Sequence, residues 1–145
     1  MIQSILIVCV GNICRSPMAA ALLNERLPRT NIVSAGLGAL VGRPAEPEAA
    51  ALLAARGLDV STHRSQQLTE LLCKQANLIL VMERGHKDQL ERHYPFTRGK
   101  VFRLGDHGGY DIFDPFRQGR ERFEACYELI DASVQRWAQS VMRLA

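Results

Sequence analysis

Residues 4–27, SILIVCVGNICRSPMAAALLNERL, place a short apolar run, a polar turn and an alanine- and leucine-rich segment in direct succession. The apolar run over residues 4–10 is rich in β-branched residues and too short for a helix, so we expect a buried strand. Residues 16–27 are expected to form a helix, with Ser16 placed to cap it and Pro17 in its first turn. The turn between them holds two cysteines and an arginine, which a simple packing turn does not need.

The rest of the chain repeats this alternation. Short apolar runs predict further strands over residues 31–36, 77–82 and 100–104. Segments with helical patterning separate them, over residues 46–56, 66–76 and 84–93. Buried strands that alternate with helices predict an α/β fold with a parallel sheet covered on both faces. Because such sheets bind ligands beyond the carboxyl ends of their strands, the turn after the first strand is the first place to look for a site.

The C-terminal third begins with a loop and ends with a long helix. Residues 105–119, GDHGGYDIFDPFRQG, are rich in Gly, Asp and Pro, which predicts a loop. From Arg120 to the end, apolar residues recur in alternating steps of four and three, at Phe123, Tyr127, Ile130, Val134, Trp137, Val141 and Leu144. This spacing predicts a helix with one face docked on the sheet.

Length and composition limit the classes of function. The 145 residues, 47% hydrophobic and 23% charged, predict one globular domain over residues 1–145. No apolar run approaches the ~20 residues of a membrane span, and the N-terminus lacks the layout of a signal peptide. We therefore expect a cytoplasmic protein that does not insert into membranes. The net charge of +3 comes without a dense Lys/Arg block, so nucleic-acid binding is not expected.

The cysteines and histidines do not form a metal or disulfide pattern. Four cysteines are too few and too unevenly spaced for a secreted disulfide framework. Cys9 and Cys14 do not form a C-x-x-C pair, and the four histidines lie far apart in the sequence. We therefore expect no metal site.

The turn over residues 9–16 carries residue types suited to binding and cleaving a phosphate ester. Gly11 and Asn12 tolerate left-handed backbone angles, so the amides can turn inward around an anion at a helix N-terminus. The planar guanidinium of Arg15 can hold two phosphate oxygens. The same positive partial charges would stabilise a thiolate at Cys9, facing phosphorus opposite the leaving oxygen. The alternative is that Cys9 is a buried strand cysteine with a packing role.

The segment CVGNICRSPMA, residues 9–19, resembles the phosphate-binding signature of the low-molecular-weight protein tyrosine phosphatases. Chain length and element order resemble that family from end to end, and Asp114-Pro115-Phe116 resembles its Asp-Pro-aromatic motif. The stretch SAGLGALVG, residues 34–42, is similar to the corresponding sequence in the bacterial branch of the family, which is associated with capsule and exopolysaccharide production. The resemblance implies a three-layer α/β/α fold with a four-stranded parallel sheet, flavodoxin-like and doubly wound. It also implies hydrolysis of phosphotyrosine without metal or cofactor, typically on an autophosphorylated bacterial tyrosine kinase.

The resemblance also implies the roles of single residues. Cys9 would be the nucleophile and form a phosphocysteine intermediate, while Arg15 and the loop amides hold the phosphoryl oxygens. Asp114 would protonate the departing phenol and then deprotonate the attacking water. The residues expected around the phosphate are Val10, Gly11, Asn12, Ile13, Cys14, Arg15 and Ser16. On spacing alone, Asp106 and Asp111 are equally good candidates for the acid, and only the motif selects Asp114.

Other positions would support the loop or line the pocket. Asn12 would hold the loop in its strained shape, and His63 matches a family position that hydrogen-bonds to this asparagine. Ser16 could donate its hydroxyl to the thiolate or merely cap the helix. Leu40 and Phe116 would form apolar walls of the pocket.

Cys14 is a second thiol inside the loop. It could capture an oxidised Cys9 as a disulfide, or it could be a small packing side chain.

Two other functions would use the same loop. An arsenate reductase of the same fold shares the Cys-x5-Arg loop but relays oxidation through a close cysteine pair, which Cys73 and Cys126 do not form in the sequence. A phosphocysteine carrier would use the same loop and would not need Asp114.

Overall fold

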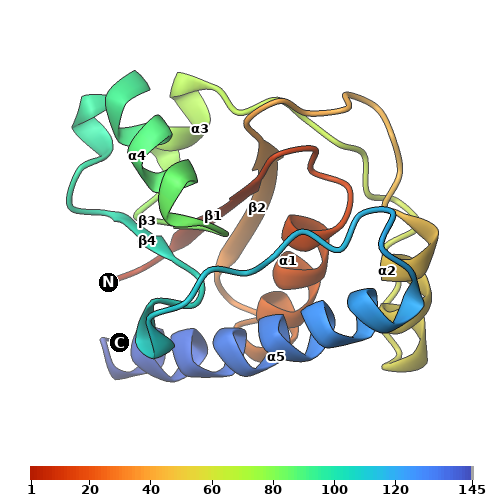
Figure 1. The fold of residues 1–145 in the computed structure, drawn as a ribbon. Helices are drawn as coiled ribbons and strands as arrows, with labels where there is room; N and C mark the ends of the chain where they lie inside the picture. The colour runs from red at the N-terminus through yellow and green to blue at the C-terminus, as the bar shows by residue number, and fades with distance from the viewer. Residues whose placement is uncertain (145) are drawn as a thin grey trace.

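Four parallel strands form the centre of the structure, a computed structural model that describes residues 1–144 (Figure 1). The strands are β1 (Ser4–Cys9), β2 (Asn31–Gly36), β3 (Leu78–Val81) and β4 (Val101–Arg103). Their order is β2-β1-β3-β4, so the direction of winding reverses between β1 and β3. The carboxyl end of β1 therefore lies at the switch point where open α/β sheets bind ligands. The predicted parallel sheet is confirmed.

Five α-helices cover the two faces of this sheet. They are α1 (Arg15–Arg26), α2 (Pro47–Ala55), α3 (Glu70–Gln75), α4 (Arg84–His93) and α5 (Arg120–Arg143). In Figure 1, α1, α2 and α5 lie on one side of the strands, and α3 and α4 lie on the other. The predicted three-layer α/β/α arrangement is therefore present.

Side chains of β1 alternate between the two layers. Ile5, Ile7 and Cys9 join the apolar cluster under α1 and α5, whereas Leu6 and Val8 join the cluster under α3 and α4. All five are almost fully buried. A fully buried aliphatic side chain contributes about 1.5–3 kcal/mol to folding, so β1 is anchored from both faces. This anchoring fixes the point from which the turn after β1 starts.

The predicted helix over residues 66–76 is wrong in its first half. Gln67 instead forms a parallel bridge with Gly36, and the amide of Leu68 bonds to the Gly36 carbonyl. The helix begins only at Glu70, where the hydroxyl of Thr69 accepts a hydrogen bond from the backbone of the first turn. Pairing with the last residue of β2 thus overrides helical patterning in this segment.

The C-terminal helix α5 follows the predicted stripe except at its end. The stripe positions that are buried or half-buried are Phe123, Tyr127, Ile130, Val134, Trp137 and Val141. Leu144 was predicted to join them, but it follows the last helical residue and its side chain is 63% exposed. Neither α5 nor any other helix within residues 1–144 is long and apolar enough to span a membrane. The preceding predicted loop contains one short 3₁₀ turn, Asp106–Gly108.

Candidate active site

Hydrogen bonds turn the carbonyl groups of the loop after β1 away from its centre. The carbonyl oxygens of Cys9, Val10, Gly11 and Ile13 accept hydrogen bonds from the amides of Leu37, Gly38, Leu40 and Glu46, respectively. In a trans peptide the N–H points opposite to the carbonyl, and no cis peptide occurs within residues 1–144. The amides that follow these carbonyls therefore face the inside of the loop, where an anion would find them.

Two backbone features allow this shape. A Cβ on Gly36 would lie 2.4 Å from the carbonyl oxygen of Val10, so only glycine permits the close approach of β2 to the loop. Asn12 has a φ of +60°, in the left-handed region. Gly11 was predicted to share this conformation, but its φ is not positive. A Cβ there would make only ordinary contacts, the nearest at 3.5 Å with Ile13. The strain is therefore carried by Asn12 alone.

Every polar group of Asn12 has a hydrogen-bond partner. Its Nδ2 donates to the hydroxyls of Ser16 (2.7 Å) and Ser34 (3.0 Å), and its Oδ1 accepts from the amide of Gln66 (2.9 Å). Its backbone carbonyl lies 2.8 Å from Nε2 of His63, so the predicted contact between His63 and Asn12 is present. This network compensates for the left-handed backbone, which costs about 1–3 kcal/mol for a residue other than glycine.

The sulfur of Cys9 lies at the floor of the loop. The amide of Asn12 points at Sγ from 3.3 Å, and the hydroxyl of Ser16 lies 2.9 Å from it. Because Ser16 Oγ already accepts a hydrogen bond from Asn12 Nδ2, its own proton is free to point at the sulfur. Ser16 was also considered as the helix cap, which is wrong, because α1 has its N-cap at Cys14 with no side-chain cap bond.

Arg15 presents one edge of its guanidinium to the loop and binds the protein with the rest. Its Nη1 donates to Glu83 Oε2 at 2.6 Å and to the carbonyl of Ile112 at 2.8 Å. Its Nε is buried without a partner, and its Nη2 lies 3.9 Å from Asp114 Oδ2. Burial disfavours the charge, but Glu83 and the nearby Cys9 and Asp114 outweigh it, so the pKa of Arg15 lies above its ordinary value. The Nε–Nη2 edge is thus a charged donor pair available to an oxyanion.

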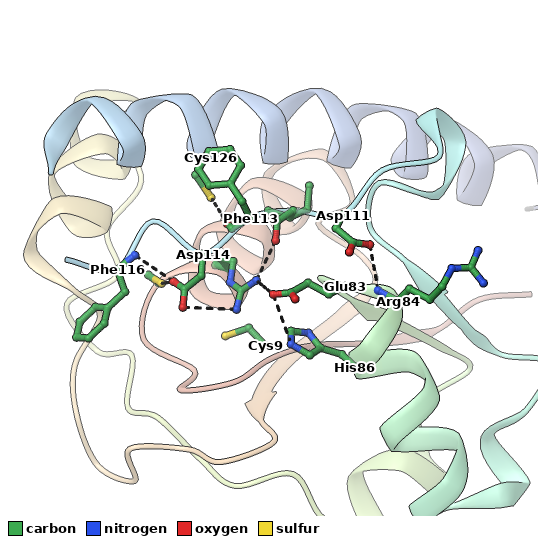
Figure 2. Close-up of polar contacts among 12 residues, drawn as sticks. Cys9, Glu83, Arg84, His86, Asp111, Phe113, Asp114, Phe116 and Cys126 are labelled. Atoms are coloured by element: carbon green, nitrogen blue, oxygen red, sulfur yellow. Dashed lines mark hydrogen bonds and ion pairs between the residues drawn. The ribbon is translucent and has the colours of Figure 1, made fainter. Parts of the chain in front are cut away.

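Asp114 is the carboxylate that faces this loop (Figure 2). Its Oδ1 accepts from the amide of Phe116 at 3.0 Å, and its side chain is 50% exposed. Asp111 instead binds the first amide of α4, at Arg84, and the side chain of Arg103. Geometry therefore separates candidates that the sequence spacing left equivalent, since Asp111 is occupied elsewhere and Asp106 does not line the cavity.

A cavity of about 200 Å³ opens above Cys9. Its lining residues are Cys9, Val10, Gly11, Ile13, Cys14, Arg15, Gly38, Leu40, Asp114 and Phe116. The predicted walls Leu40 and Phe116 are both among them. Two larger hollows, of about 510 and 390 Å³, contain neither a cysteine nor a guanidinium facing a loop of amides. Among the described residues, no three His, Cys, Asp or Glu side chains are grouped to bind a metal ion.

Two further thiols lie near the cavity. Burial raises the pKa of the Cys14 thiol to about 12, and its Sγ lies 3.9 Å from Asp114 Oδ1. Burial also raises the pKa of Cys126 to about 12, and its Sγ donates to the carbonyl of Phe113 at 3.4 Å. Both remain protonated at neutral pH, so neither competes with Cys9 as a nucleophile.

Sequence reasoning missed Glu83 and His86. Glu83 lies two residues after the end of β3 and bonds to Arg15, while His86 is buried one helical turn further along. A topological signal was available, because the carboxyl ends of β1 and β3 meet at one edge of the sheet. A charged residue just beyond β3 was therefore a candidate neighbour of the loop.

The chain matches a known protein family over nearly its whole length. The family described as "Low molecular weight phosphotyrosine protein phosphatase" matches residues 4–144. The chain belongs to this family. It is 47% identical over 144 residues to the probable low molecular weight protein-tyrosine-phosphatase EpsP of Ralstonia nicotianae, with 99% of each chain covered. The family resemblance read from the loop and the Asp-Pro-Phe motif is therefore confirmed.

Solved structures of family members have the same fold. Vibrio vulnificus Wzb in complex with benzylphosphonate superposes with a TM-score of 0.93 at 44% identity, covering 97% of this chain and 99% of that one. The YwlE arginine phosphatase from Geobacillus stearothermophilus superposes with a TM-score of 0.91 at 36% identity, covering 97% and 94%. The flavodoxin-like fold expected from the resemblance is confirmed, and the similar proteins include one named as a tyrosine phosphatase and one named as an arginine phosphatase.

Proposed function

We propose that the protein hydrolyses phosphotyrosine in protein substrates through a phosphocysteine on Cys9. The observation that carries this proposal is the orphaned, buried Nε of Arg15 beside an inward-facing amide loop with a thiol at its floor. Buried donors normally have acceptors, and a phosphoryl group in the loop would supply one. The same donors would strengthen their hold as charge spreads over the oxygens in the transition state.

The reaction uses Cys9, Asp114 and a water molecule in two displacements. Sγ of Cys9 attacks phosphorus in line with the ester oxygen, the P–O bond breaks, and Asp114 gives its proton to the departing phenolate. Asp114 then takes a proton from water, which attacks the phosphocysteine and releases phosphate. Ser16 donates to the thiolate before attack and after release, and Asn12 with His63 keeps the loop in shape.

The walls of the cavity favour an aromatic ester. Cys9 is only 2% exposed, so a phosphate reaches it only on a side chain long enough to span the cavity. Leu40 and Phe116 offer apolar surfaces to such a ring. We expect phosphoserine, whose phosphate lies closer to its backbone, to reach Cys9 poorly.

The physiological substrate we propose is an autophosphorylated bacterial tyrosine kinase that controls exopolysaccharide or capsule production. Support comes from the similarity to EpsP and Wzb, together with the resemblance of residues 34–42 to that branch. We place this activity in the cytoplasm, since the four free cysteines fit a reducing compartment.

A metal-free turnover assay on the purified protein separates the alternatives. We expect hydrolysis of a phosphotyrosine peptide and little or none of phosphoserine and phosphoarginine peptides. Arsenate with thioredoxin should not be reduced, because Cys126 donates to a backbone carbonyl and Cys73 lies in the other core layer. Preferred turnover of phosphoarginine or arsenate, or phosphocysteine formation without release, would contradict the proposal.

A further inference from the structure

The guanidinium of Arg15 is oriented from behind by Glu83. Nη1 of Arg15 donates to Glu83 Oε2 and to the carbonyl of Ile112. Both contacts lie on the opposite side of the guanidinium from the Nε–Nη2 edge that faces the cavity. Arg15 is 2% exposed, so its plane cannot turn without breaking both contacts. The direction in which Nε and Nη2 point therefore depends on Glu83.

His86 lies against the same carboxylate (Figure 2). Its Nε2 is 3.6 Å from Glu83 Oε2, the oxygen that Arg15 binds, and its Nδ1 is buried without a partner. The charged groups that face His86 are Glu83 at the start of α4, Arg15 from α1, and Asp111 and Asp114 from the loop before α5. Burial, opposed by Glu83 and aided by Arg15, lowers the pKa of His86, so the imidazole is neutral at pH 7.

From this geometry we propose that Glu83 and His86 are positioning residues for Arg15. Glu83 fixes the guanidinium, and the protonation state of His86 sets how firmly Glu83 does so. The inference rests on the proposed hydrolysis at Cys9 and adds two residues that never touch the substrate.

The mechanism is competition for one carboxylate oxygen. When His86 is neutral, Arg15 is the only cation within residues 1–144 that lies close to Glu83 Oε2, so the full charge of this oxygen acts on the guanidinium. When His86 gains a proton, the imidazolium attracts the same oxygen, and Arg15 loses part of its anchor. Misplacing a catalytic group by about 1 Å can lower a rate by about 100-fold, so a looser anchor is measurable. Activity and anion affinity should therefore fall as pH decreases through the pKa of His86.

The test uses Glu83→Gln, Glu83→Asp and His86→Gln, with Glu91→Gln and His93→Gln as controls on the same helix. Glu91 pairs with Lys87 and His93 is exposed, so neither control affects Arg15. Steady-state kinetics with p-nitrophenyl phosphate and calorimetric binding of inorganic phosphate are measured between about pH 4.5 and 8, a range that brackets histidine titration.

We expect Glu83→Gln to lower kcat by about 10–100-fold and to weaken phosphate binding, with Glu83→Asp partly restoring both. For His86→Gln, the ratio of variant to wild-type kcat should be constant at neutral and higher pH and rise several-fold toward the acid end of the range, because glutamine never gains the competing proton. A ratio that is flat across pH, or Glu83 variants that behave like Glu91→Gln, would overturn the inference.

Failure of the proposed function would look different. Wild-type protein that turns over no phosphate ester contradicts the hydrolytic function. The calorimetric comparison still tests the positioning role in that case, because phosphate binding needs only Arg15 and the loop. If the wild type is active but the ratio is flat, the control by His86 is rejected; if the wild type is active but the Glu83 variants behave like Glu91→Gln, the role of Glu83 is rejected. In both cases the hydrolytic function stands.

Discussion

The phosphate loop, residues 9–16, and the acid segment, residues 111–118, meet at one cavity but are held in opposite ways. Successive carbonyls of the loop are bonded to flanking backbone, and its functional side chains Cys9 and Arg15 are each 2% exposed. The acid segment lies on the surface, and the Asp114 side chain is 50% exposed. A fixed anion site is thus combined with an acid on a surface segment, where a bulky ester can reach it.

The largest effect should come from the fixed region. Cys9→Ser should lower kcat for an aryl phosphate by about four orders of magnitude or more, because an un-ionised hydroxyl replaces the attacking sulfur. Cys73→Ser, which changes a buried cysteine in the other core layer, is the matched control and should retain activity. Circular dichroism should show both variants folded, and substantial turnover by Cys9→Ser would remove the nucleophile assignment.

The acid segment should show a loss that depends on the leaving group. Asp114→Asn should lower kcat/KM for phenyl phosphate by about 100–1,000-fold, because phenolate needs a proton to depart. For p-nitrophenyl phosphate the loss in kcat/KM should be much smaller, since nitrophenolate departs without help. Asp106→Asn, in the same loop but outside the cavity, should leave both rates unchanged. Equal losses on both esters would mean that Asp114 is not the acid.

A backbone test addresses the fixed shape itself. Gly36→Ala puts a methyl group 2.4 Å from the Val10 carbonyl, which must move the loop. We expect a loss of about 1–3 kcal/mol in the free energy of unfolding and about a tenfold or greater loss in kcat/KM. Gly38→Ala meets no atom within 4 Å and should change stability by about 0.5 kcal/mol or less. Equal behaviour of the two variants would show that the loop does not depend on this approach.

The smallest effect concerns the contact between the regions. Cys14 belongs to the loop, but its thiol lies beside Asp114. Peroxide would convert Cys9 to a sulfenic acid, which Cys14 would condense with to give a disulfide and water. Dithiothreitol should then restore most activity in the wild type and markedly less in Cys14→Ala. Equal recovery in the two proteins would leave Cys14 with a packing role.

The two regions also differ in how well the sequence predicts them. Strand, turn and helix over residues 4–27 follow from local patterning, because β1 is buried on both faces and the loop residues adjoin it in the chain. Residues 66–69 were misassigned as helix, since Gly36, which pairs with Gln67, lies 31 residues before it in the sequence. Glu83 and His86 escaped detection for the same reason, because only the fold brings β3 beside β1. Spacing alone did not separate Asp114 from Asp111; the resemblance of Asp114-Pro115-Phe116 to the family motif did, and the contacts of Asp111 with Arg84 and Arg103 agree with that choice.

The most direct test of the account is to trap the covalent intermediate. Asp114→Asn would be mixed with p-nitrophenyl phosphate, quenched within milliseconds and digested, and the peptides analysed by mass spectrometry. The account predicts one phosphoryl group on the peptide that contains Cys9, accumulating because the base that activates water is missing. Burst release of nitrophenolate should match the amount of phosphopeptide. A burst without a phosphorylated Cys9, or phosphate on another residue, would contradict the central claim.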